Sequence, residues 1–177
     1  MKQLLLSLLV VMSISGISHA QEDTDVISHM LIVEKNQEME RLLQKRDPKE
    51  TIDFLHAHVK EDAVFNIELD NPTFTKETGQ KSVKIDKTAY INSFIQGLHY
   101  VDDYKVKIDT KNIKISDNKK SAVVTETMTE DGVITHEKTR IPFNSQTTCT
   151  TTYSMNEGVI TSDTASCKTS TGETNTI

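Results

Sequence analysis

The sequence predicts an α+β domain in which three N-terminal helices pack on an antiparallel sheet. Up to Leu98, apolar residues recur mainly with helical spacing, whereas from Val106 onward they recur every second residue, as in strands. The predicted strands alternate apolar with polar residues, which is typical of a sheet covered on one face. Helices that precede the strands, rather than alternate with them, favour an α+β layer fold.

Residues 1–20 have the layout of a cleavable secretory signal. Lys2 supplies a positive charge, an apolar stretch extends to Ile17, and Ser18 and Ala20 place small residues where a signal peptidase reads them. The apolar stretch is shorter than the roughly 20 residues that a membrane-spanning helix needs. We therefore expect cleavage after Ala20 and an exported protein, periplasmic or secreted, with no stable membrane insertion.

The remainder has the length of one domain, which we place at residues 21–168, with a flexible polar tail at 169–177. The chain has 20 Lys and Arg against 26 Asp and Glu, and removal of Lys2 with the leader makes it still more acidic. Negative charge opposes binding to nucleic-acid phosphates and to anionic lipid, so we expect neither partner.

Two helices are predicted before the first strand. The first covers Asp25 to Lys45 and has apolar residues near one face. The second has a strong start, with Asp47 as the N-cap, Pro48 at the first helical position and Glu50 at the capping-box position. We expect it to end near Lys60.

A short strand at 63–69 and a third helix follow. Residues 73–84 are polar and are interpreted as a loop or a ragged hairpin. Asp86 is predicted to cap a helix that reaches Leu98. Its apolar residues fall at helical spacing on one face, namely Ile91, Phe94, Ile95 and Leu98.

Thr- and Val-rich strands fill the rest of the domain, and they include a hairpin that brings the two cysteines together. The turn at 156–158 joins two strands, and if Met155 faces Ile160, then Cys149 and Cys167 lie nearly opposite on neighbouring strands. In an oxidising compartment such a pair is most simply a disulfide. A metal or redox pair is the alternative, and the absence of C-x-x-C spacing speaks against it.

This order of elements resembles the NTF2-like superfamily, also described as SnoaL-like or as the cystatin-like cone. The resemblance rests on the helix from Asp25, the second helix with the strand-like segment 62–65 after it, the third helix to Leu98, and the strands from Tyr104 to Cys167. It implies a curved antiparallel sheet that curls around the helices and leaves a cone-shaped pocket or an exposed sheet face. The family includes isomerases, dehydratases, pocket-binding proteins and assembly modules, so the resemblance does not select a function.

The candidate catalytic residues lie around the end of the second helix. His56 and His58 are two residues apart, so on a helix they cannot hold one metal ion and at most one can face inward. Asp62 lies where the resembled family often places a polar or catalytic group. A hydrogen-bonded core histidine and a solvent-facing aspartate are the alternatives. A catalytic Asp62 would also need an oxyanion donor, and the first two predicted helices contain no tyrosine to supply one.

His99 and Tyr100 follow the third helix and are candidate ligand-binding residues at a pocket mouth; capping of the helix end is the alternative. The sequence has no phosphate loop or dinucleotide fingerprint and no cluster with metal-ligand spacing. We therefore expect no cofactor and no metal.

Three functions are compatible with these features. The leading hypothesis is a non-enzymatic domain that binds a small apolar ligand or a partner protein. The alternatives are a small lyase, isomerase or hydrolase that uses Asp62 and a histidine in the cone, and an assembly component of an envelope or secretion machine. Binding predicts an apolar pocket lining, catalysis predicts convergent polar groups, and assembly predicts an apolar patch outside. A homodimer is compatible with each.

Overall fold

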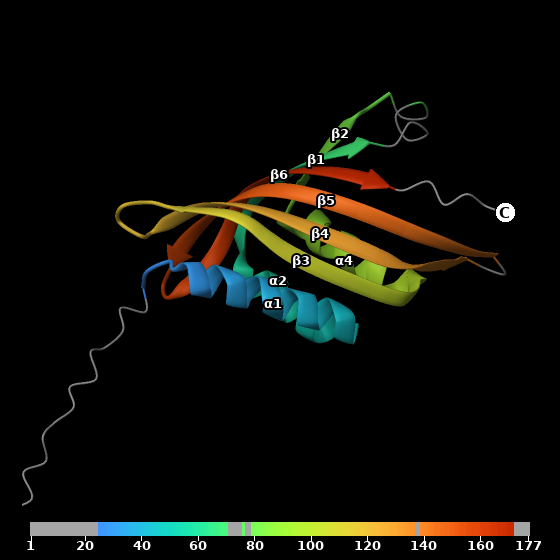
Figure 1. Cartoon of the computed structure of the whole chain (residues 1–177), viewed down its shortest axis with the longest axis horizontal. Coiled ribbons are helices and arrows are strands. Elements are labelled where there is room, and N and C mark those ends of the chain that lie inside the picture. The colour runs from blue at the N-terminus through green and yellow to red at the C-terminus, as the bar shows by residue number, and fades with distance from the viewer. Residues whose placement is uncertain (1–24, 71–75, 77–78, 137–138, 172–177) are drawn as a thin grey trace, which may run out of the picture.

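The computed structural model describes residues 25–70, 76, 79–136 and 139–171, and it contains three helices packed on one side of a six-stranded sheet (Figure 1). The predicted leader and its predicted cleavage site lie outside the described residues. The elements in chain order are α1 (His29–Lys45), α2 (Pro48–His58), β1 (Val59–Asp70), β2 (Ser82–Asp86), α4 (Lys87–Tyr100), β3 (Val101–Ile115), β4 (Ser121–His136), β5 (Thr139–Asn156) and β6 (Val159–Thr171). Among the described residues, no helix is long and apolar enough to cross a membrane.

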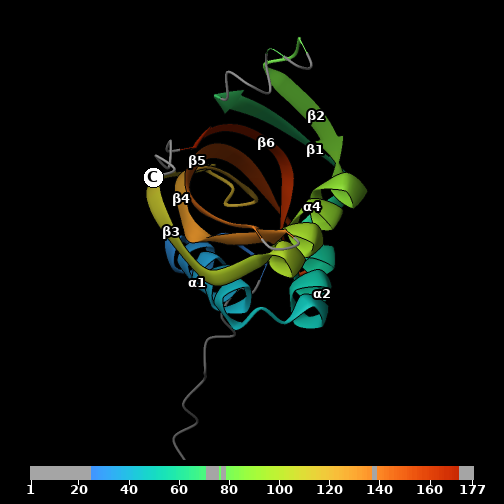
Figure 2. The same ribbon diagram turned by 90° about the vertical axis from the view of Figure 1, so that its right-hand side faces the viewer.

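The sheet has the strand order β2-β1-β6-β5-β4-β3 and is strongly curved. Seen end-on, β3 to β6 curl into an open barrel, and the helices close its open side (Figure 2). All neighbouring strands are antiparallel except β1 and β6, which are parallel. The sheet is therefore not the purely antiparallel one expected from the sequence. Strands β1 and β6 are distant in the chain and are not joined by a hairpin, so no turn forces them to run antiparallel.

Several element boundaries differ from those predicted. Helix α1 begins at His29 rather than Asp25, because Ser28 is its N-cap and accepts a hydrogen bond from the Leu31 N–H at 3.1 Å. Helix α2 begins with the predicted Asp47 cap but ends at His58, where strand β1 begins. Ser162 Oγ of the neighbouring strand β6 donates to the His58 carbonyl at 3.2 Å.

The segment expected to be a loop or ragged hairpin at 73–84 ends in strand β2, which pairs with β1 and leads into the Asp86 cap of α4. Strand β6 runs to Thr171, so residues 169–171 of the predicted tail belong to the sheet; residues 172–177 lie outside the described part.

The core lies between the helices and the concave face of the sheet. Helix α1 lies along the edge strand β3 and satisfies its backbone, since Glu40 accepts from the Ile108 N–H at 2.8 Å and Gln44 donates to the Val106 carbonyl at 2.9 Å. A second, smaller cluster around Tyr153 closes the end of the cone near the start of α1. The opposite end, near the C-terminus of α4, is therefore the open end of the cone, and the larger cavity lies beside it.

The β5–β6 hairpin contains the expected disulfide between Cys149 and Cys167. Its two-residue turn has Glu157 and Gly158 in left-handed conformations, with φ of 49° and 80°. Met155 pairs with Ile160 as predicted. A one-residue register shift farther along the hairpin then places the cysteines directly opposite each other, with Cα atoms 4.0 Å apart.

Candidate functional site

The interior of the cone holds two adjoining chambers. The inner chamber has a volume of about 80 Å³, and the outer chamber, toward the open end, has a volume of about 340 Å³. The side chains that line both chambers are Tyr90, Phe94, Met128, Thr147, Cys149 and Cys167. The disulfide is therefore part of the wall between a small inner space and a larger outer one.

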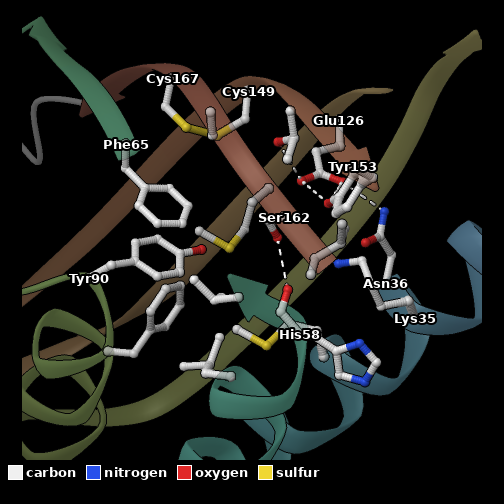
Figure 3. A pocket seen from close by; sticks show the side chains of 18 of the residues that line it. Lys35, Asn36, His58, Phe65, Tyr90, Glu126, Cys149, Tyr153, Ser162 and Cys167 are labelled. Carbon is white, nitrogen blue, oxygen red and sulfur yellow. Dashed lines mark hydrogen bonds between the residues drawn. A yellow bond between two sulfur atoms is a disulfide. The ribbon is translucent and has the colours of Figure 1, made fainter. Parts of the chain in front are cut away.

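Glu126 of β4 is the centre of the polar side of the inner chamber (Figure 3). The amide of the buried Asn36 donates to its carboxylate at 2.8 Å, and the hydroxyls of Tyr153 and Thr151 donate at 3.3 and 3.4 Å. Asn36 comes from α1, whereas the hydroxyls come from β5. The carboxylate is thus held by two elements, and charge-assisted hydrogen bonds of this kind are stronger than neutral ones.

Lys35 directs its ammonium group toward the same chamber from α1 (Figure 3). Its Nζ atom lies 4.8 Å from the centre of the Tyr153 ring, a cation–π contact. Burial lowers the pKa of Lys35, and the nearby negative charge of Glu126 partly opposes that shift. The inner chamber therefore contains one carboxylate and one ammonium group.

His58 borders the inner chamber but is engaged by the protein itself. Its Nδ1 is 2.9 Å from the Ile160 carbonyl, so Nδ1 carries the proton and donates, and its ring packs on Phe54 at 4.4 Å between centroids. Burial lowers the pKa of His58; the bond to Ile160 opposes this shift and the charge of Lys35 adds to it. The imidazole is therefore biased toward its neutral form.

Tyr90 presents a hydroxyl to the cavity from α4 (Figure 3). Its ring stacks on Phe65 with centroids 3.8 Å apart and meets the edge of Phe94 at 5.0 Å. Burial raises the pKa of Tyr90, and the negative charges of Glu126 and Glu130 raise it further. Tyr90 is therefore a rigidly placed neutral hydroxyl.

The outer chamber is mainly apolar, and Glu130 alone carries a charge among the described residues that line it. Tyr104 donates to one of its carboxylate oxygens at 2.5 Å, and the buried Ser145 donates to the other at 2.9 Å. Burial and the adjacent Glu130 charge raise the pKa of Tyr104. Gly132 of β4 lies tightly against two residues that line this chamber: an added Cβ would lie 2.6 Å from the Val101 side chain and 2.9 Å from that of Phe143.

No protein-family model and no curated protein matches the sequence, whereas the structure is similar to solved structures. A conserved protein from Planctomyces limnophilus has a TM-score of 0.62 at 10% identity, over 81% of this chain and 96% of that chain. A putative scytalone dehydratase from Novosphingobium aromaticivorans has a TM-score of 0.57 at 14% identity, over 84% and 88%. A protein with a cystatin-like fold from Caulobacter vibrioides has a TM-score of 0.55 at 12% identity, over 80% and 88%.

The chain has the cystatin-like fold. This confirms the fold expected from the order of its elements. At these identities the similarity establishes the fold and not the activity.

The cone does not bring the proposed catalytic residues together. The Asp62 side chain is 79% exposed and lies 3.6 Å from Lys60. His56 is exposed as well, and of the three candidates only His58 borders a chamber. The reason is the early end of α2 at His58: residues 61 and 62 belong to an irregular stretch of β1 whose side chains face solvent.

His99 and Tyr100 are exposed and line neither chamber; their rings contact each other, with centroids 6.0 Å apart. The described residues contain no group of three or more His, Cys, Asp or Glu side chains that could hold a metal ion.

The polar residues of the cone that sequence reasoning missed are Glu126, Glu130, Lys35 and Asn36. The positions of Glu126 and Glu130 in the sequence could have predicted that they face the cone. On a strand, every second residue faces the same side, so Glu126 and Glu130 share the face of the buried Val124 and the partly buried Met128. Lys35 and Asn36 carried no such signal, because each is a single polar residue in an ordinary helix.

Proposed function

We propose that the cone binds a small, mostly apolar molecule whose body occupies the outer chamber. The observation that carries this proposal is the outer chamber of about 340 Å³, which is lined mainly by apolar side chains and adjoins a smaller inner chamber that has a few polar groups on one side. Small-molecule sites in proteins are typically concave and apolar, with a few placed polar groups. A ligand that enters from the open end buries its apolar part against Phe94, Leu98 and Met128, while its leading end meets Tyr90.

The polar side of the inner chamber favours recognition over catalysis, because its carboxylate, Glu126, is already hydrogen-bonded by the protein. Glu126 accepts three side-chain donors from the chain itself. A carboxylate so engaged fixes the shape and charge of the chamber floor. Such satisfied networks stiffen a site and make it selective for one arrangement of donors and acceptors.

Acid–base catalysis is the second candidate, and one observation favours it. Glu126, Lys35 and His58 place a carboxylate, an ammonium and an imidazole around one small chamber. One structurally similar protein is described as a putative scytalone dehydratase. Proton exchange tests this candidate: a bound ketone probe should gain deuterium from heavy water with the unaltered protein, and not with Glu126→Gln. No exchange above the rate in buffer would count against catalysis of this kind.

We propose further that the domain works after export. The leader-like residues 1–20 and the disulfide support this, because disulfides persist in oxidising compartments. Mass analysis of the protein from the exporting cell should give a mature chain that starts at Gln21. A mature chain that still begins at Met1 would contradict export by cleavage.

The binding proposal is tested by native mass spectrometry together with a blocked chamber. Met128→Trp places a larger side chain into the shared wall of the two chambers. The control Val123→Trp places the same side chain on the outer face of the same strand, at a residue that is 42% exposed. We expect a co-purifying small molecule on the unaltered protein and on Val123→Trp, and none on Met128→Trp. Equal ligand occupancy in both variants would refute binding in the cone. A co-purifying protein would instead favour a partner-protein role.

A further inference from the structure

The geometry points to an organic cation, such as an apolar amine, as the ligand of the outer chamber, with its charged end against Glu130. This inference rests on the proposed binding function and specifies its ligand class.

Glu130 has hydrogen-bond partners but no opposite charge. Its two oxygens accept from the hydroxyls of Tyr104 and Ser145, and both donors are neutral. Among the described residues, no Lys, Arg or His forms an ion pair with Glu130. Each carboxylate oxygen still has a free lone pair, so the group can accept further donors from a ligand.

The inner chamber shows how this same fold compensates a carboxylate. Glu126 lies four residues before Glu130 on the same face of β4, and it has a nearby ammonium group, that of Lys35, seated over the Tyr153 ring at 4.8 Å. Carboxylate, aromatic ring and cation therefore occur together there. The outer chamber repeats the carboxylate and the aromatic rings without a cation of its own, and the rings that line it are those of Tyr90, Phe94, Tyr104 and Phe143.

The negative potential of these carboxylates extends across the chamber. Besides burial, the charge of Glu130 raises the pKa of both Tyr104 and Tyr90, which come from two different elements, β3 and α4. A positive group that enters this low-dielectric space is attracted by the carboxylate, whereas an anion is repelled. The same charge therefore selects for amines and against acids of similar shape.

Three probes of matched shape test this: phenylbutylamine, phenylbutanol and phenylbutyrate, each titrated calorimetrically into the whole exported domain. We expect the amine to bind about tenfold more tightly than the alcohol, which corresponds to about 1.4 kcal/mol. The acid should bind most weakly. Glu130→Gln keeps the shape of the side chain and should abolish the preference for the amine. Glu34→Gln makes the same charge change on the exposed face of α1 and should leave the preference intact.

The outcomes separate this inference from the binding proposal. If the alcohol binds the unaltered protein as tightly as the amine, or if a folded Glu130→Gln retains the amine preference, the cation inference is overturned and binding in the chamber stands. If none of the three probes binds, both fail. The comparison of amine with alcohol uses the unaltered protein, so it decides the question even if the Glu130 variant does not fold.

Discussion

Removal of the disulfide measures how much the cross-link between β5 and β6 contributes to stability. We consider the double variant Cys149→Ala, Cys167→Ala. The two residues are separated by 18 positions, and closing a loop of that size in the unfolded chain corresponds to about 3 kcal/mol in the loop-entropy model. This value is an upper limit, because the loop is a hairpin whose turn at Glu157 and Gly158 already favours the folded geometry.

We therefore expect the double variant to lose about 1–3 kcal/mol of unfolding free energy. Urea denaturation followed by circular dichroism measures it. The denaturant slope should also increase, because an unfolded chain without the cross-link is more expanded and exposes more surface. A loss of stability without a change in slope would show that the bond acts in the folded cone, and no loss at all would refute the argument from loop entropy.

Two further predictions concern His58 and Gly132. The folded-state pKa of His58 lies below its ordinary 6.5, so its stabilising contribution is complete above pH 6.5 and is lost as the pH falls below that value. The unfolding temperature should decrease more steeply in mildly acidic buffer for the unaltered protein than for His58→Asn, and identical pH profiles would contradict a buried neutral imidazole. Gly132→Ala should cost about 1–3 kcal/mol, because its Cβ would lie 2.6 Å from Val101 and 2.9 Å from Phe143. Wild-type stability of this variant in thermal unfolding would show that the packing around Gly132 is looser than described.

Local signals predicted the parts of the fold that depend on neighbouring residues. The Asp47 cap fixes the start of α2, and the turn at 156–158 fixes the pairing of Met155 with Ile160. Both involve residues close together in the chain. The parallel pairing of β1 with β6 left no such signal, because it joins segments separated by most of the domain.

The candidate site was harder to predict for the same physical reason. Asp62 lies just after the end of α2, as a catalytic residue of the cone would, only if that helix continues to Lys60. The chain instead enters β1 at Val59, and an irregularity in the register before Val64 decides which side chains face the cone. A register shift of one residue exchanges the two faces of a strand, and nothing in the local sequence marks it.

The most direct test of the proposed binding function is nuclear magnetic resonance of the protein with phenylbutylamine. If the ligand occupies the outer chamber, intermolecular Overhauser contacts should connect its aromatic protons to the methyl groups of Met128 and Leu98, which line the cone. The exposed methyl groups of Val123 and Val159 should show none. Contacts to Val123 or Val159 without contacts to Met128 would place the ligand outside the cone and contradict this account.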